Sequence, residues 1–297
     1  MTESRGVHNG KHLMCLVPLV FAACGPPLGA DVETTGEARE ELIGTPTTRL
    51  GVVELKGLNG HFCSGVMISP HVVLTAGHCA AYVLPAGTKS AVVTGPTVRY
   101  QFPDGVKRCI SAYPTSDWEC STITPLRVTQ WPGYTNDLDT PNDFAVFTTD
   151  IHWYGPGDSD FAYIYTDTMT AYSRYQLYGY GGNAFGGAGG EVLRTGSMEW
   201  DSLRTHDFTL IERGTRVCLG DSGGPATVYQ SSSGAEMHVA GLFSNMNVTP
   251  SGFCGAEGAT ARYTRLSVKV PWIKSTTGAP CTEITSPVTG HKVQRCF

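Results

Sequence analysis

One serine of the chain has neighbours suited to nucleophilic chemistry. Residues 220–225 read Gly-Asp-Ser-Gly-Gly-Pro, with Ser222 at the centre. A serine hydroxyl is a poor nucleophile until a base takes its proton and donors receive the resulting oxyanion. Flanking glycines let the backbone bend so that its own N–H groups point at that oxyanion. An ordinary Gly-Ser turn is the alternative, but this run arises by chance in well under about one chain in 10⁵.

A candidate base lies at the end of a strand-like run, in Leu-Thr-Ala-Gly-His-Cys at residues 74–79. Histidine suits the role because its pKa lies near neutrality and either ring nitrogen can carry the proton. The other histidines of the chain are, taken singly, more readily bystanders. His78 differs because Cys79 adjoins it and Cys63 lies a short loop away. A Cys63–Cys79 bridge would lock the segment that presents the imidazole.

A carboxylate that could orient this base precedes an apolar strand, in Asn-Asp-Phe-Ala-Val-Phe at residues 142–147. A buried aspartate is costly unless it is paired, so Asp143 suggests a partner such as an imidazole N–H. From the residues alone, Asp137, Asp139 and Asp150 compete with it. A simple strand-opening turn is an equally good interpretation at this point.

Short strands must position these groups. From residue 50 onward, β-favouring runs alternate with turn residues, as in residues 50–55, 65–68, 144–147 and 239–243. Such spacing, without long helical periods between the runs, predicts an antiparallel sandwich or barrel. One helix is predicted over residues 266–275 from its shared apolar face. With 36 glycines in 297 residues and only 16% charged residues, the composition disfavours disorder and helical bundles.

The N-terminal residues 1–24 have the pattern of an export signal. A polar, basic start precedes an apolar run at residues 13–23, which is too short to span a bilayer. A buried core helix is the alternative, and Pro18 inside the run disfavours it. Residues 25–41 are polar and rich in Gly, Pro and Thr, which indicates a linker or pro-segment. The remainder is therefore expected outside the cytoplasm, secreted or anchored to the cell envelope.

The end of the signal is open to two interpretations. Phe-Ala-Ala-Cys at residues 21–24 resembles the lipobox of bacterial lipoproteins, which would make Cys24 a lipid anchor and the one expected membrane contact. Cleavage after Ala30 would instead release the chain. The formal charge of −5 and the lack of a basic stripe exclude nucleic acid as an expected partner.

Eight cysteines remain once Cys15 and Cys24 are assigned to the export region. None of them forms a Cys-x-x-Cys pair or a Cys/His cluster with finger-like spacing, so zinc is weakly supported. Disulfides are the better interpretation in an oxidising space. We expect neither a metal nor a cofactor. The eight are Cys63, Cys79, Cys109, Cys120, Cys218, Cys254, Cys281 and Cys296.

The motifs around His78, Asp143 and Ser222, in that order, resemble the trypsin/chymotrypsin family of serine proteases. Supporting segments are Phe-Cys-Ser-Gly at 62–65, Gly-Tyr-Gly at 179–181, Gly-Leu-Phe-Ser at 241–244, Tyr-Thr at 263–264 and Trp-Ile at 272–273. The resemblance covers about residues 42–275. It implies an all-β fold of two six-stranded antiparallel barrels, at about 42–155 and 156–265. The helix at 266–275 and a disulfide-closed tail at 276–297 would follow.

The resemblance also implies a mechanism and partners. Ser222 would attack a peptide bond, His78 would act as base and then acid, and Asp143 would orient His78. The N–H groups of Gly220 and Ser222 would form the oxyanion hole. The expected partners are protein or peptide substrates and a proteinaceous inhibitor. The protein itself is expected to be a monomer. By the family's pattern Cys218 pairs with Cys254, which leaves Cys109–Cys120 and Cys281–Cys296 by elimination.

The chain departs from the family at its specificity pocket. Six residues before Ser222, trypsin-like enzymes have an aspartate that selects basic side chains, and this chain has Arg216. A preference for acidic side chains is one hypothesis, and an Arg216 that turns outward or fills the pocket is the other. Ser244 to Met246 would offer an edge strand to the substrate backbone. Within it Asn245 replaces an aromatic residue, and Met246 replaces a glycine that leaves the pocket open.

Activation is the second departure. Family members expose a new Ile-Val-Gly-Gly terminus whose ammonium pairs with the aspartate before the nucleophile, which is Asp221 here. Glu-Leu-Ile-Gly-Thr at residues 41–45 is a partial match, so cleavage after Glu41 would free Leu42 for this pairing. The leading hypothesis is an exported serine endopeptidase without trypsin-like specificity. A catalytically silent homologue that serves as a binding module is the alternative.

Overall fold

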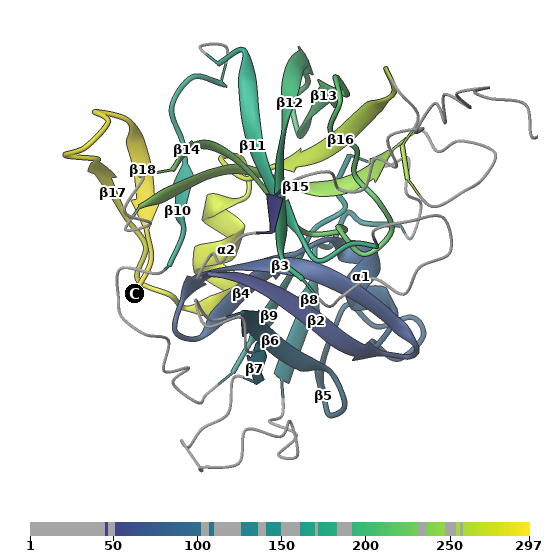
Figure 1. Ribbon diagram of the computed structural model, residues 1–297. Coiled ribbons are helices and arrows are strands. Elements are labelled where there is room, and N and C mark those ends of the chain that lie inside the picture. The colour runs from purple at the N-terminus through teal and green to yellow at the C-terminus, as the bar shows by residue number, and fades with distance from the viewer. Residues whose placement is uncertain are drawn as a thin grey trace, which may run out of the picture. The chain divides into compact units, whose positions relative to one another are not determined.

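The structure is a computed structural model. It describes residues 45–46, 51–101, 107–109, 126–135, 141–149, 161–169, 172–182, 192–230, 236–246, 254–255 and 258–297. The expected signal, the linker and Leu42 lie outside these residues. Two sheets make up most of the described chain. In Figure 1 the first is coloured purple to teal, and the second runs from teal to yellow apart from the purple residues 45–46. No helix among the described residues is long and apolar enough to cross a membrane.

The first sheet holds the described strands between residues 52 and 148. Its eight strands are hydrogen-bonded in the order β5-β8-β9-β4-β3-β2-β6-β7. Strand β8 alternates, with Leu126 and Val128 buried and Arg127 between them exposed, whereas β4 is buried along its whole length. The bounds are β2 (Val52–Leu58), β3 (His61–Ser69), β4 (Val72–Thr75), β5 (Ser90–Val93), β6 (Thr97–Gln101), β7 (Lys107–Cys109), β8 (Leu126–Gln130) and β9 (Ala145–Thr148).

The second sheet closes on itself. Strands β11-β12-β13-β16-β15-β14 pair in sequence, and β14 also pairs with β11, which completes a six-stranded barrel. The predicted all-β, double-barrel fold is thus confirmed, with one difference. The described strands of the first sheet form an open half-barrel rather than a closed barrel. The bounds are β11 (Arg174–Gly179), β12 (Arg194–Leu203), β13 (Asp207–Ile211), β14 (Pro225–Gln230), β15 (Met237–Met246) and β16 (Thr260–Arg265).

The C-terminal residues add to the second barrel. A hairpin of β17 (Thr282–Thr285) and β18 (Lys292–Arg295) pairs with β10 (Tyr163–Tyr165), which runs parallel to β15. The Cys281–Cys296 disulfide joins the two ends of the hairpin. The short strand β1 (Thr45–Pro46) pairs with β12. The tail is therefore part of the sheet rather than an appendage.

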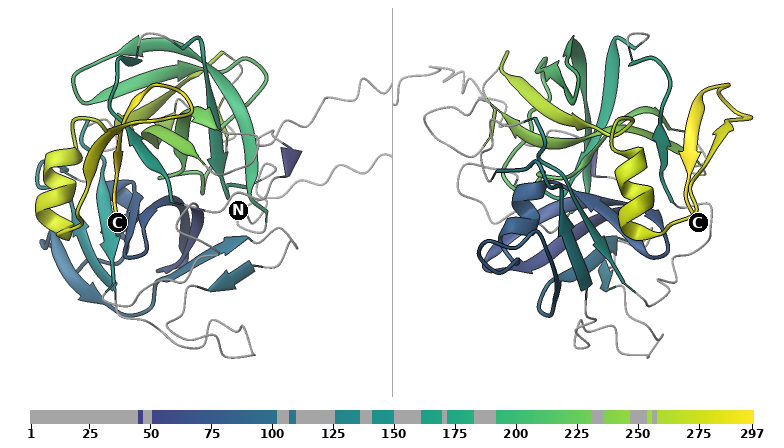
Figure 2. Two further views of the ribbon diagram at one scale, coloured as in Figure 1. Left: turned by 90° about the vertical axis from the view of Figure 1, so that its left-hand side faces the viewer. Right: turned by 180° about the vertical axis from the view of Figure 1, so that it is seen from behind.

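The helix α2 (Val270–Thr277) begins four residues later than the predicted start at 266. Pro271 lies in its first turn, where a residue without an N–H costs no helical hydrogen bond. Gly278 ends it in the left-handed conformation, with φ +69°. Figure 2 shows α2 at the boundary between the sheets, where Ile273 shares a core with Phe144 of the first sheet and Leu242 of the second.

Candidate active site

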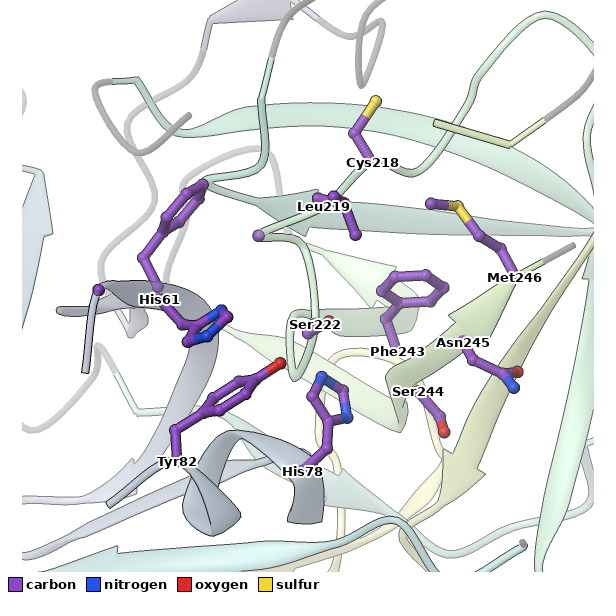
Figure 3. A pocket seen from close by; sticks show the side chains of 13 residues that line it. His61, His78, Tyr82, Cys218, Leu219, Ser222, Phe243, Ser244, Asn245 and Met246 are labelled. Atoms are coloured by element: carbon purple, nitrogen blue, oxygen red, sulfur yellow. The ribbon is translucent and has the colours of Figure 1, made fainter. Parts of the chain in front are cut away.

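His78 is presented at the start of a short helix that follows a buried strand. β4 is fully buried and leads into α1 (Gly77–Ala81), so His78 leaves the core at the boundary of the first sheet. The Cys63–Cys79 disulfide ties this helix to β3, and the Gln130 side chain donates to the Gly77 carbonyl at 2.8 Å. The imidazole faces a cavity that Ser222 also lines (Figure 3).

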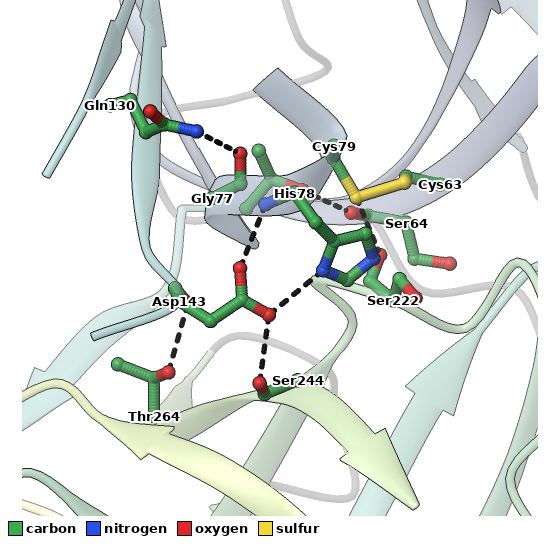
Figure 4. Close-up of polar contacts among 11 residues, drawn as sticks. Cys63, Ser64, Gly77, His78, Cys79, Gln130, Asp143, Ser222, Ser244 and Thr264 are labelled. Carbon is green, nitrogen blue, oxygen red and sulfur yellow. Dashed lines mark hydrogen bonds and ion pairs between the residues drawn. A yellow bond between two sulfur atoms is a disulfide. The ribbon is translucent and has the colours of Figure 1, made fainter. Parts of the chain in front are cut away.

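The structure brings Asp143 to His78. The His78 Nδ1 lies 2.8 Å from Asp143 Oδ2, and the His78 backbone N–H donates to Oδ1 at 2.7 Å (Figure 4). Asp143 is fully buried, which acts to raise its pKa. The charge of His78 and the hydrogen bonds from His78 and Ser244 outweigh burial and lower the pKa of Asp143 below its usual value. The competing Asp137, Asp139 and Asp150 lie outside the described residues.

Two hydroxyl groups of the second barrel complete the surroundings of Asp143. Ser244 Oγ donates to Asp143 Oδ2 at 2.7 Å, and Thr264 Oγ1 donates to the Asp143 carbonyl at 2.9 Å. Ser244 was predicted to offer its backbone to the substrate, and its buried side chain binds this carboxylate. Both contacts join residues more than a hundred positions apart. Local sequence patterns carry no signal for them.

Ser222 lies on a turn that is fastened to the first sheet. The Ser64 N–H donates to the Ser222 carbonyl at 2.8 Å, and Ser64 Oγ donates to the Gly220 carbonyl at 2.9 Å. With these carbonyls held, the N–H groups of Gly220 and Ser222 have no acceptor within the described part of the chain. Two free N–H groups beside a serine hydroxyl are the geometry that an oxyanion requires.

Gly220 cannot be replaced without backbone strain and a shift of the Phe62 ring. Its φ is +96°, in the left-handed region, and a Cβ there would lie 1.9 Å from the Phe62 ring. Gly223, with φ +80°, is similarly confined, because its Cβ would lie 2.1 Å from Thr75 Oγ1. The glycines of the motif therefore allow the nucleophile turn to approach the first sheet closely.

Asp221 points away from the cavity into the protein. It accepts the N–H groups of Gly181 and Cys218, each at 2.8 Å, and its side chain is buried. Burial raises the pKa of Asp221 to about 7, although these two hydrogen bonds and the charge of Arg194 act to lower it. A cation placed beside this carboxylate would remove the cost of its charge. The expected partner, Leu42, lies outside the described residues.

The cavity has a volume of about 280 Å³ and walls from both sheets. In Figure 3 the side chains of His78 and Tyr82 come from the first sheet, and those of Phe243 and Met246 from the second. The cavity is lined by Ser244, Asn245 and Met246, whose role in specificity stays a prediction, whereas Arg216 is not among its lining residues. The lining residues are Gly60, His61, Phe62, His78, Tyr82, Cys218, Leu219, Gly220, Ser222, Phe243, Ser244, Asn245 and Met246.

Two cavity residues were not expected from the sequence. His61 and Tyr82 stack with ring centroids 4.0 Å apart, and Tyr82 meets the His78 ring edge-on. Burial, and next the charge of Asp143, raises the pKa of Tyr82, so its hydroxyl stays protonated at neutral pH. Tyr82 follows His78 by one helical turn, which is a spacing that could have indicated it.

Three of the four expected disulfides are present: Cys63–Cys79, Cys218–Cys254 and Cys281–Cys296. The Cys109–Cys120 pair lies outside the described side chains. Among the described residues, the one cluster of possible metal ligands is Cys63, His78 and Cys79. Its two sulfur atoms are joined in a disulfide, so they are not available as thiolate ligands.

The family model of trypsin matches residues 45–148, which hold β1 to β9 with His78 and Asp143. The match ends before Ser222. No curated protein matches the chain at a significant level. The family match and the two sheets confirm the resemblance that the three motifs indicate.

Proposed function

With a domain of the trypsin/chymotrypsin-like serine protease family in the chain, we propose that it is an exported serine endopeptidase. The observation that carries the proposal is the His78–Asp143 pair, at 2.8 Å, facing the cavity that Ser222 also lines. A nucleophile, a base and an orienting carboxylate at one cavity are the groups that acyl transfer by a serine uses.

In the proposed reaction, Ser222 Oγ attacks the carbonyl carbon of the scissile peptide bond. His78 Nε2 takes the hydroxyl proton and then gives it to the leaving amine, which leaves an acyl-enzyme. Water attacks the acyl-enzyme by the same route and releases the acid product. Asp143 holds the proton on His78 Nδ1 and stabilises the imidazolium, because the carboxylate stays charged in its buried site.

The oxyanion of each tetrahedral intermediate would be received by the N–H groups of Gly220 and Ser222. Ser64 holds the carbonyl groups of both residues, which fastens the turn that carries these donors to the first sheet. The proposal therefore assigns a positioning role to Ser64, which lies on the first sheet.

Specificity is proposed to differ from that of trypsin. The second-barrel wall of the cavity has an apolar surface, formed by Leu219, Phe243 and Met246. Arg216 stands where trypsin-like enzymes have the aspartate that selects basic side chains, so that carboxylate is missing. Such a surface favours apolar side chains of modest size over lysine or arginine. A peptide library read by mass spectrometry tests this point, and cleavage mainly after Lys or Arg would refute it.

Activation is proposed to follow cleavage after Glu41. Strand β1 holds Pro46 opposite Arg194, which also pairs with Gly179, and a Cβ on Gly179 would lie 2.0 Å from the Asp221 carboxylate. Pro46 therefore lies two strands from Gly179, in the same sheet. Mass spectrometry of the active protein should find Leu42 at its N-terminus, whereas full activity in a chain that retains residues 31–41 would exclude this route.

The decisive experiment is labelling with a fluorophosphonate probe after N-terminal processing. The wild-type chain should be labelled, and Ser222→Ala should not. The alternative, a silent homologue used as a binding module, is favoured by Met246 at the cavity mouth and by the partial activation motif. Absence of Ser222-dependent labelling in a folded, processed chain would support that alternative.

A further inference from the structure

Lys269 is a buried cation beside the Asp143 segment. Its side chain is fully buried, and its Nζ donates to Asn142 Oδ1 at 2.7 Å. The same ammonium lies 3.7 Å from the centroid of the Trp131 ring, within the range of a cation–π contact. Asn142 immediately precedes Asp143 in the chain. The ammonium group of Lys269, which lies directly before α2, thus holds Asn142, the neighbour of the proposed orienting carboxylate.

The charge on Lys269 is costly where it lies. Burial lowers the pKa of Lys269 to about 8, although the carboxylate of Asp207 acts to raise it. At pH 7 the side chain is therefore still charged. No carboxylate of the described residues lies within ion-pair distance of its Nζ, and the neighbouring core is apolar. An apolar side chain would fill this space at lower cost, which indicates that the ammonium serves a purpose other than packing.

The segment from Asn142 to Phe144 is held by a contact at each of its three residues. Thr264 holds the Asp143 carbonyl, as described above, and the Trp131 N–H donates to the Phe144 carbonyl at 2.8 Å. The Phe144 ring packs against Trp272 with centroids 5.5 Å apart. The Asn142 side chain is held by Lys269. Lys269 is the charged member of this set, and it belongs to the chain that follows the second barrel.

We propose that Lys269 is a positioning residue for the reaction proposed above. Through Asn142 it fixes the backbone that carries Asp143, and so the direction in which the carboxylate meets His78. The inference rests on the proposed function, because orientation of Asp143 matters only if His78 acts as a base. The charged groups near this contact are Asp143 itself, Asp207 on β13 and Arg204, which lies 3.9 Å from the Asp207 carboxylate.

A packing role and a positioning role predict different results for Lys269→Met. Methionine keeps the length and apolar stem but removes the buried charge, so the thermal midpoint should stay unchanged or rise. A positioning role further requires kcat to fall about tenfold while KM stays within twofold, because the change affects the transition state and not binding. Lys274→Met, on the exposed side of α2, is the matched control and should stay within twofold of wild type in both constants.

Asn142→Ala removes the same contact from its other end and serves if Lys269→Met fails to fold. Where Lys269→Met folds, the double variant should have the same kcat as either single variant, because one interaction cannot be lost twice. The experiment uses the naturally processed chain, a small ester substrate and proton NMR of the His78 Nδ1–H resonance. This downfield signal should be present in wild type and weakened or shifted in both single variants.

The proposal is overturned if folded Lys269→Met keeps kcat within twofold of wild type, or if the losses of the two single variants add in the double variant. Failure of the proposed function has a different signature. In that case wild type shows no Ser222-dependent turnover. The NMR signal then decides the role of Lys269 alone, and an unchanged His78 resonance in both variants would exclude it.

Discussion

The two barrels contribute unequally to the site. The first is an open sheet that supplies His78 and Asp143, and the trypsin family model matches it almost from end to end. The second is closed, supplies Ser222 and most of the cavity wall, and lies beyond that match. It also carries the added hairpin of β17 and β18. The proposed base and its carboxylate are therefore in the first barrel, and the proposed nucleophile and most of the cavity wall are in the second.

This difference has a physical basis. A base and its carboxylate need one geometry whatever the substrate, so few sequences satisfy the first barrel's task. The cavity wall of the second barrel needs to fit only one class of side chain, and many sequences can do that. The contacts that join the barrels, Ser64 with Ser222 and Asp143 with Ser244, likewise need one particular geometry, so few other residues could replace them. The predictions below test this division.

The largest expected effect is on the first barrel. Asp143→Asn should lower kcat by about 10⁴, because the amide would favour the wrong tautomer of His78. Steady-state hydrolysis of an ester substrate measures this change in kcat. Asp201→Asn, at an exposed carboxylate of β12, is the control and should stay within twofold. A loss of less than tenfold for Asp143→Asn would mean that His78 is oriented without the carboxylate.

The second effect is the pH dependence that Asp221 gives to the second barrel. Its pKa is raised to about 7 in the fold against 3.8 when unfolded, so between these pH values the folded chain keeps a proton that the unfolded chain loses. The free energy of unfolding of the unprocessed chain should therefore fall by up to about 4 kcal/mol as pH rises from 4 to 7. Urea unfolding measures it.

Processing reverses that sign. An ammonium of Leu42 beside Asp221 would lower the pKa of the carboxyl group below its unfolded value, so this stability would be lost as pH falls. Asp221→Asn removes the dependence in either form and is the control. The same pH dependence before and after processing would show that no ammonium reaches Asp221.

Two disulfides of similar span allow a direct comparison of the barrels. Cys63–Cys79 closes a separation of 16 residues and Cys281–Cys296 one of 15. Replacing either pair by serine should cost about 3 kcal/mol of stability. Only the Cys63 and Cys79 pair should also lower kcat, because it fixes the helix of His78. Equal kcat values for the two folded double variants would contradict the role given to the first bridge.

The smallest effect concerns the cavity wall. Met246→Gly should widen the cavity and shift the preference for large over small side chains before the scissile bond by about tenfold, with kcat on the best substrate little changed. Competition between paired peptides measures this ratio. Val288→Gly, at an exposed apolar position of the C-terminal hairpin, should leave the ratio at the wild-type value.

The sequence was sufficient for features that depend on neighbouring residues. The short β-favouring runs separated by turn residues predict the β fold, and the glycines around Ser222 predict a bend of the backbone, at which Gly220 has a φ of +96°. The roles of His78, Asp143 and Ser222 stay predictions, although the structure brings the first two into contact. The start of the helix was misplaced because the apolar face continues upstream of Pro271, where the chain only turns.

Features that depend on distant residues could not be predicted. The residues alone could not choose Asp143 over Asp137, because the partner lies 65 positions away. The contact between Lys269 and Asn142 spans 127 positions, and a lysine before a helix normally indicates a solvated surface. The open edge of the first sheet is likewise set by pairing between strands and not by any one strand.

The hydrogen bond from Ser64 to the Ser222 carbonyl has a consequence for how the molecule could be divided. It belongs to a set of contacts, with Ser244, Thr264 and Lys269, that joins the barrels without the covalent chain between Thr149 and Phe161. Continuity of the polypeptide at that point is not what holds the site together. Two fragments that meet there would each carry part of the proposed catalytic site, which is the requirement for a split protein whose restored activity would report the association of its parts.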